Sequence, residues 1–457
     1  MPEPQRRPNI LLIMADQFRA DHLGAAGADF VRTPNLDRIA REGVAFRRCF
    51  TNSPVCAPAR IGLASGLQPV RLGATDNGAY LPISTPTYYQ RLRDAGYRVG
   101  CVGKLDLAKP DGFNGRHGDR PCAFGWGFTH PCECEGKMHA GASPTPRGPY
   151  TFWLAERGLL GKFHQDYRRR QAGGWNIGVC EDSVLPAEAF EDAWIGQRAA
   201  EWLEGVPGEF PWHYFVSFVG PHDPFDPPTD HAEHFRQAEM PPAIGAAGED
   251  KPRWVRRRSR EHDPAAVAVS RRQYCAAIEV IDEAVGKMLD ALERRGQLGN
   301  TFVLFTSDHG EMLGDHGLYA KSVMYEPALN VPLLAAGPGI EGARTSEAVV
   351  ELIDLNPTVC ELAGLPPQEN IDARSLTPVL RGDAGEHRSE AVSQLTSCRC
   401  IRTDRHKLIV SFNDTPELYD LAADPAEQHN LADEQPDLAG ELRGRLHRRL
   451  LEGKWRR

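Results

Sequence analysis

Long apolar runs are missing from this 457-residue sequence, in which no stretch approaches the roughly 20 apolar residues that a membrane-spanning helix needs. The apolar run at residues 10–15 is too short for the core of a signal peptide, and it ends at Asp16 without a small-residue cleavage site. We therefore expect a cytoplasmic protein that has no contact with membranes.

An excess of positive charge is also missing. Lys and Arg number 53 and Asp and Glu 62, a net charge of −9, which excludes a chain built as a whole to attract nucleic acid. The eleven cysteines are an odd number and are scattered, which argues against a disulfide framework. The pairs Cys132/Cys134 and Cys398/Cys400 lack the C-x-x-C spacing typical of zinc sites.

What the sequence does contain is an alternation of buried strands and amphipathic helices. The run at residues 9–15 predicts a central strand, residues 33–43 a helix, residues 274–296 a longer helix, and residues 301–307 a second buried strand. This order predicts an α/β fold, a mostly parallel central sheet with helices on both faces. We expect this catalytic domain over residues 1–385.

The alternation of strands and helices stops after about residue 385, where short strand-like runs precede a helical pattern at residues 436–451. We expect a small C-terminal α+β subdomain over residues 386–457, an antiparallel sheet with a helix.

The segment WHYFVSFVGPHDP at residues 212–224 repeats the pattern of a strand followed by polar residues. Polar side chains thus follow three predicted strands, as the dipeptides at residues 16–17, 222–223 and 308–309. Active sites of parallel sheets gather beyond the carboxyl ends of the strands, so we expect these pairs to converge. Asp16, Gln17, Asp308 and His309 then offer mostly oxygen donors and one imidazole, a set that suits one divalent cation, Ca²⁺ first and Mn²⁺ as the alternative. Any one of these acids alone could equally cap a helix or lie on the surface.

Cys56, Pro58 and Arg60 form a C-x-P-x-R signature, with Ser65-Gly66 after it. With this signature the sequence resembles the sulfatase family of the alkaline-phosphatase-like superfamily. Further similar segments are AGYRVGCVGK, GPHDPFDPP, TSDHGEMLGDHG and ELYDLAADPAEQHNLAD, which occur in the family's order over nearly the whole chain.

The resemblance implies that a maturation enzyme oxidises Cys56 to formylglycine (3-oxoalanine). One hydroxyl of the hydrated aldehyde then attacks sulfur, and deprotonation of the other re-forms the aldehyde and expels sulfate. In the family's pattern Arg60 orients the diol, Lys104 and Lys321 contact the sulfuryl oxygens, and His222 is a general acid at the leaving oxygen.

The metal pairs and the segment after the cysteine loop are closest in style to choline sulfatases and phosphonate monoester hydrolases. This resemblance implies that Asn77 contacts substrate; a turn-forming role before Gly78 is the alternative. Most sulfatases read G-K-x-H at the first lysine, whereas this chain has Asp106 in place of the histidine. A second GKMH at residues 136–139 suggests that His139, together with Lys137, compensates; a chance match in a glycine-rich loop is the alternative.

The resemblance predicts a sulfuric ester hydrolase acting on a small-molecule sulfate ester. The alternatives are a phosphonate monoester or phosphodiester hydrolase on the same scaffold, and a non-catalytic anion-binding protein. The sequence leaves open whether the chain forms a homo-oligomer.

Overall fold

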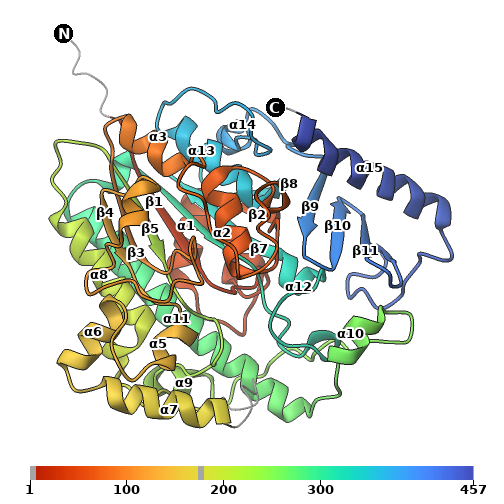
Figure 1. Cartoon of the computed structure of the whole chain (residues 1–457), viewed down its shortest axis with the longest axis horizontal. Helices are drawn as coiled ribbons and strands as arrows, with labels where there is room; N and C mark the ends of the chain where they lie inside the picture. Colours follow the sequence, from red (N-terminus) through yellow and green to blue (C-terminus); the bar gives the residue numbers. More distant parts are fainter. Residues whose placement is uncertain (1–6, 173–179, 456–457) are drawn as a thin grey trace.

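A central sheet of eight strands, in the order β4-β3-β5-β1-β6-β7-β2-β8, forms the middle of the molecule (Figure 1). The structure, a computed structural model, describes residues 7–172 and 180–455. The strands of this sheet are β1 (Asn9–Ala15), β2 (Val44–Phe50), β3 (Arg98–Gly103), β4 (His130–Glu133), β5 (Trp212–Ser217), β6 (Thr301–Ser307), β7 (Asn330–Ala336) and β8 (Arg344–Glu351).

Strand β7 is antiparallel to both of its neighbours, and all other adjacent strands of the sheet are parallel. The carboxyl ends of β3, β5, β1 and β6 therefore meet at one edge of the sheet. The α/β architecture with a mostly parallel sheet is confirmed.

Helices cover both faces of the sheet. The helices up to residue 205 are α1 (Pro34–Glu42), α2 (Cys56–Ser65), α3 (Tyr88–Asp94), α4 (Pro121–Gly125), α5 (Lys137–Ala142), α6 (Pro149–Glu156), α7 (Leu160–Ala172) and α8 (Glu191–Gly205). Those after it are α9 (Thr229–Phe235), α10 (Arg253–Arg258), α11 (Pro264–Arg294), α12 (Glu326–Leu329), α13 (Leu355–Leu362), α14 (Thr377–Arg381) and α15 (Pro436–Trp455).

Successive side chains of β1 pack alternately into two separate apolar cores, as expected for a strand buried on both faces. Leu11 and Ile13 pack with residues of α1, α8 and α11, whereas Ile10 and Leu12 pack with residues of α2, α3 and α13. The predicted helix at residues 33–43 is α1. The one predicted at 274–296 is α11, which begins ten residues earlier because Asp263 caps it and Pro264 occupies its first turn.

A second, antiparallel sheet lies beside the first, with α15 on its outer side (Figure 1). Its strands are β9 (Glu390–Gln394), β10 (Cys398–Thr403), β11 (His406–Ser411) and β12 (Glu417–Asp420), in the order β12-β11-β10-β9. Cys398 and Cys400 of β10 pack in one core with Phe50 and Tyr325 of the larger part. The small sheet is confirmed; the boundary at residue 385 stays a prediction.

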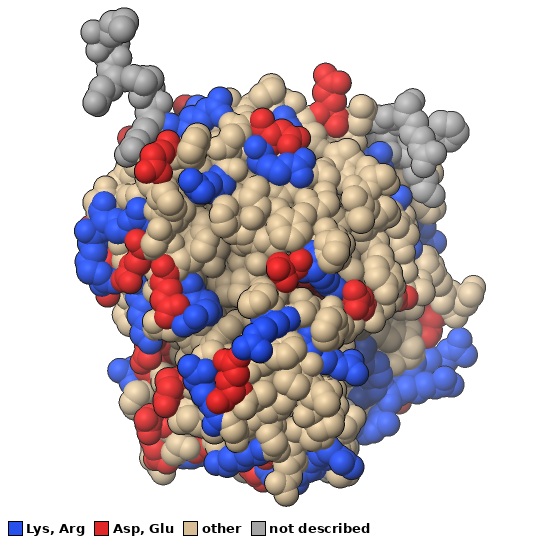
Figure 2. Space-filling view, turned by 60° about the vertical axis from the view of Figure 1, so that its left-hand side comes forward, with Lys and Arg blue, Asp and Glu red and all other residues tan. Residues whose placement is uncertain are grey.

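Among the described helices, none combines the length and apolar character that crossing a bilayer requires. Lys and Arg side chains are mixed with Asp and Glu over much of the face shown in Figure 2.

The start of α1 is capped from another helix. Asp282 of α11 is buried, and its Oδ1 accepts from the backbone N–H groups of Leu36 (2.8 Å) and Asn35 (3.1 Å). Because these N–H groups have no partner within their own helix, Asp282 both satisfies α1 and fixes it against α11.

We predict that Asp282→Ala lowers the free energy of unfolding by about 1–2 kcal/mol, since it removes a helix cap. Thermal unfolding measures the loss as a lower midpoint temperature. Asp290→Ala, an exposed position on the same helix, is the matched control. Equal midpoints for the two variants would contradict the assignment.

Candidate active site

Three polar side chains leave the ends of parallel strands directly, Asp16 after β1, Lys104 after β3 and Asp308 after β6. His222 does not, because β5 ends at Ser217 and the chain continues through a loop before reaching it. This loop is tied back to the strand tips, since the N–H of Asp16 donates to the carbonyl of Gly220 (2.9 Å). The predicted convergence is therefore correct, although His222 comes from a loop.

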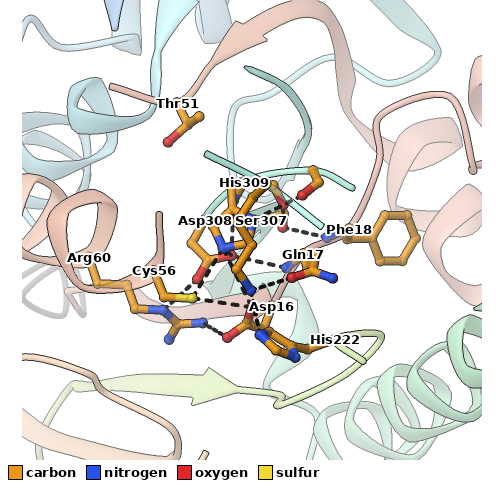
Figure 3. Close-up of polar contacts among 12 residues, drawn as sticks. Asp16, Gln17, Phe18, Thr51, Cys56, Arg60, His222, Ser307, Asp308 and His309 are labelled. Atoms are coloured by element: carbon orange, nitrogen blue, oxygen red, sulfur yellow. Dashed lines mark hydrogen bonds and ion pairs between the residues drawn. The ribbon is translucent and has the colours of Figure 1, made fainter. Parts of the chain in front are cut away.

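Four potential ligand groups meet at this edge. Asp16, Cys56, Asp308 and His309 each direct one ligand atom into a cluster in which all atoms lie within 4.8 Å of one another (Figure 3). All four side chains are fully buried. His309 turns Nε2 toward the cluster because its Nδ1 is hydrogen-bonded to the carbonyl of Gly310 (2.9 Å). The structure thus brings together three of the four predicted metal ligands.

The fourth predicted ligand, Gln17, lies beside the cluster and has other partners. Its Oε1 accepts from Lys321, and its Nε2 donates to Glu311 and to Asp223 Oδ1 (3.2 Å). Its backbone has φ 71°, in the left-handed region, and its N–H donates to Asp308 Oδ1 (3.0 Å). Ligation of a metal by Gln17 stays a prediction.

Arg60 neutralises the two buried carboxylates. Its Nε donates to Asp308 Oδ2 (2.7 Å), and its Nη2 lies 3.4 Å from Asp16 Oδ2. The remaining Nη1 donates to the carbonyl of Lys104 (2.6 Å) and to the hydroxyl of Ser217 (2.7 Å). Burial alone would raise the pKa of Asp16, but Lys104, His222 and Arg60 hold that pKa well below its usual value. Arg60 is therefore fixed by the acids and does not reach into open space.

Cys56 is the first residue of α2, so its side chain lies at the positive end of the helix dipole. Its Sγ is 3.2 Å from His309 Nε2. The next N–H, that of Ala57, donates to Asn77 Oδ1 (3.1 Å), so Asn77 anchors the first turn of the helix that carries the thiol. Burial raises the pKa of Cys56, and the surrounding ammonium groups outweigh it and hold this pKa well below the usual value. The helix start and the nearby ammonium groups therefore favour a negatively charged side chain at position 56.

Lys321 and His222 form the opposite side of the site. The ammonium of Lys321 contacts Gln17 Oε1 and His222 Nε2. The other ring nitrogen of His222 lies 2.7 Å from the carbonyl of Asp223. From these partners we assign the proton of neutral His222 to Nδ1, which leaves Nε2 as the atom that can exchange a proton with a ligand.

The first-lysine side of the site contains a residue that sequence reasoning missed. Lys104 contacts Asp16 and lies 3.1 Å from Asp106 Oδ2, and the same oxygen pairs with Lys109. Nothing in the family motif marks Lys109, since it lies beyond the motif. Ser217 also lies outside the similar segments. Glu311 lies inside the segment TSDHGEMLGDHG, but the resemblance assigned it no role, and its contact with Gln17 exists only in the folded chain.

A cavity of about 300 Å³ opens over these groups. Asn77, Lys104, Lys109, His139, His222 and Lys321 contribute to its lining. His139 is part of its wall, and burial lowers the pKa of this imidazole. The cavity places a ligand in reach of residues from four separate loops.

Lys137 does not supply a free charge, contrary to the suggestion that it compensates for Asp106. It is buried, pairs with Asp226 Oδ1 (2.6 Å), and donates to the carbonyls of Pro224 (2.6 Å) and His222 (3.3 Å). All of these partners belong to the His222 loop. Lys137 therefore holds that loop, and although it also lines the cavity, its charge is paired with Asp226.

Comparison with known proteins gives two family matches. The Sulfatase family model matches residues 8–365, and the model for the C-terminal region of N-sulphoglucosamine sulphohydrolase matches residues 314–455. The choline-sulfatase of Rhizobium meliloti is 32% identical over 93% of this chain and 83% of its own length. The arylsulfatase of Clostridium perfringens is 27% identical over 93% and 90%.

Solved structures agree with these matches. The phosphonate monoester hydrolase of Agrobacterium radiobacter superposes with a TM-score of 0.82 at 26% identity, covering 98% of this chain and 96% of that one. The shared fold extends over both sheets, since nearly the whole chain is matched.

We predict that Lys137→Met lowers the free energy of unfolding by about 3–5 kcal/mol, because Asp226 would remain buried without its partner. Thermal unfolding measures the effect as a lower midpoint. Lys162→Met on α7, where the side chain is exposed, is the control. If Lys137→Met unfolded at the wild-type midpoint, the assigned role in holding the loop would be wrong.

Proposed function

Because this chain belongs to the sulfatase family and is a sulfuric ester hydrolase, we propose that it hydrolyses a small-molecule sulfate ester with formylglycine at position 56. The observation that carries the proposal is the cluster of Asp16, Cys56, Asp308 and His309 within 4.8 Å. A nucleophile that a metal ion activates has to lie beside the metal ligands. The side chain at position 56 meets this condition, because it is buried among the candidate ligands at the start of α2.

We further propose one divalent cation held by Asp16, Asp308 and His309, with Gln17 as a fourth ligand. Two carboxylates and an imidazole fit a hard cation, Ca²⁺ first and Mn²⁺ as the alternative. When bound, the cation supplies Lewis-acid chemistry, lowering the pKa of a coordinated hydroxyl. Arg60 bonds the outer oxygen of Asp308 and thereby fixes how this carboxylate presents its other oxygen.

Formylglycine at position 56 would supply a nucleophilic hydroxyl and then an aldehyde that releases sulfate without attack by water at sulfur. The chain supports this side chain from two directions. The amino end of α2 favours negative charge on it, and Asn77 holds the backbone of the following residue. A formylglycine-generating enzyme is the partner that this proposal requires.

Two lysines and one histidine would act on the ester itself. The ammonium groups of Lys104 and Lys321 contact Asp16 and Gln17, and would meet the charge that spreads over the sulfuryl oxygens. Protonated His222 would give its Nε2 proton to the leaving oxygen. Lys321 contacts that same nitrogen, so release of the proton leaves an acceptor for the ammonium.

A phosphonate monoester hydrolase activity is the second candidate. It is favoured by the fold match to the Agrobacterium radiobacter enzyme and by the Asp-Gln and Asp-His pairs at the strand ends. Sulfate and phosphonate esters present similar tetrahedral anions. A panel of aryl sulfates, phosphates and phosphonates ranks the two by kcat/KM, and higher values for phosphonates would replace the leading proposal.

We predict that mass spectrometry of active protein detects formylglycine in the peptide that contains Cys56. Cys56→Ala should lose at least a thousandfold in turnover, because the nucleophile is gone. Cys122→Ser, at a half-buried cysteine outside the cluster, should retain turnover and is the control. Full activity with an unmodified thiol would contradict the proposal.

We predict that chelation of divalent ions abolishes turnover and lowers the thermal midpoint, because a ligand bound only by the folded state stabilises it. Adding back Ca²⁺ or Mn²⁺ should restore both quantities, and the more effective ion identifies the cofactor. Asp308→Asn should weaken the response of the midpoint to added ion. A chelated protein that keeps wild-type turnover would rule out the cation.

A further inference from the structure

One carboxylate oxygen next to the cavity binds two lysines that line it. Asp106 Oδ2 lies 3.1 Å from Lys104 Nζ and 2.5 Å from Lys109 Nζ. Asp106 is buried and has φ 55°, in the left-handed region, which few residues other than glycine adopt and in which aspartate is among the more frequent of those. The backbone is thus turned so that this carboxylate reaches both ammonium groups.

Starting from Asp16 in the cluster of candidate metal ligands, negative and positive side chains alternate outward through Asp106. Asp16 pairs with Lys104, Lys104 with Asp106, and Asp106 with Lys109. The exposed fraction of the side chain rises from 5% at Lys104 to 16% at Lys109. Lys109 therefore lies one ion pair farther from the reacting centre and nearer to solvent.

Lys109 lines the cavity, where its ammonium group can contact a ligand. Lys104 and Lys109 both line it, whereas Asp106 lies beneath them and does not. The neighbouring wall residue His139 has a lowered pKa because of burial, so at neutral pH it carries little charge. Lys137 also lines the cavity, but its side chain is only 3% exposed and pairs with Asp226. Lys109, whose side chain is 16% exposed, is therefore the more accessible of these two lysines.

We propose that Lys109 is a specificity-determining residue that binds a second anionic group, such as a carboxylate, on the alcohol part of the sulfate ester. The proposal rests on the proposed function, in which Lys104 contacts the sulfuryl oxygens. A charge one ion pair farther out would then meet the leaving group. Asp106 holds both ammonium groups beside one carboxylate oxygen, so a ligand bound at Lys104 also has Lys109 nearby.

A plainer role for Lys109 would be to neutralise Asp106, which otherwise would draw Lys104 away from the substrate. The two roles differ in what happens when both charges are removed together. A neutraliser becomes unnecessary once Asp106 is an amide, whereas a residue that binds substrate stays necessary.

The experiment compares phenyl sulfate with 3-carboxyphenyl sulfate, which differ by one carboxylate. We expect wild-type protein to show the higher kcat/KM for the carboxylated ester. Lys109→Gln should reduce this preference about tenfold to a hundredfold, the range for one charge-assisted hydrogen bond. Lys109→Arg should retain most of it, and Lys287→Gln, an exposed lysine on α11, should retain all of it.

The double variant Asp106→Asn/Lys109→Gln decides between the two roles. We expect its preference to stay as low as that of Lys109→Gln. Recovery of the wild-type preference in the double variant would overturn the proposal in favour of neutralisation. Wild-type turnover of both esters with equal kcat/KM would also overturn it while leaving the proposed function intact. Release of sulfate from neither ester would overturn both.

Discussion

Two carboxylates without solvent contact, Asp16 and Asp308, impose the constraint on which the rest of the site depends. Burial of a charge is unfavourable unless partners compensate it, and here the partners come from elsewhere in the sequence. Arg60 reaches both acids from α2, and Lys104 reaches Asp16 from the end of β3. A parallel sheet makes this arrangement feasible because it delivers residues that are far apart in sequence to one edge.

The same requirement shapes the groups around the cluster. On one side the charges alternate through Lys104, Asp106 and Lys109. On the other, Lys321 is shared between Gln17 and His222, so two ammonium groups flank position 56. The lysines that compensate buried polar groups in the folded chain are thus the same lysines that can bind an anionic ligand. The same ammonium groups therefore serve both stability and binding.

Much of this was accessible from the sequence. Buried strands closed by acids predicted the sheet edge and the meeting of Asp16, Asp308 and His309, because strand direction alone decides where such residues gather. The loop contacts were not accessible. Nothing local in the sequence marks Lys137 as the residue that holds the His222 loop, since its partner Asp226 is far away in the chain and the pairing exists only after folding. Lys109 was missed for a related reason, because its ion pair with Asp106 depends on the left-handed backbone conformation of Asp106.

The resemblance is informative about the half of the site that would act on the sulfuryl oxygens and says less about the leaving-group half, where it marks His222 alone. Apart from Lys321, the sulfuryl half is built from strand ends and from α2, which the sheet holds in fixed relation, so a motif suffices to identify it. The leaving-group half is built from loops, where one substitution can be absorbed by a new neighbour. Asp106 by itself would cancel the charge of Lys104; with Lys109 on the same oxygen, the three groups together keep one positive charge. The departure from the motif therefore moves positive charge outward along the cavity wall, toward the part of the substrate on which members of a hydrolase family differ.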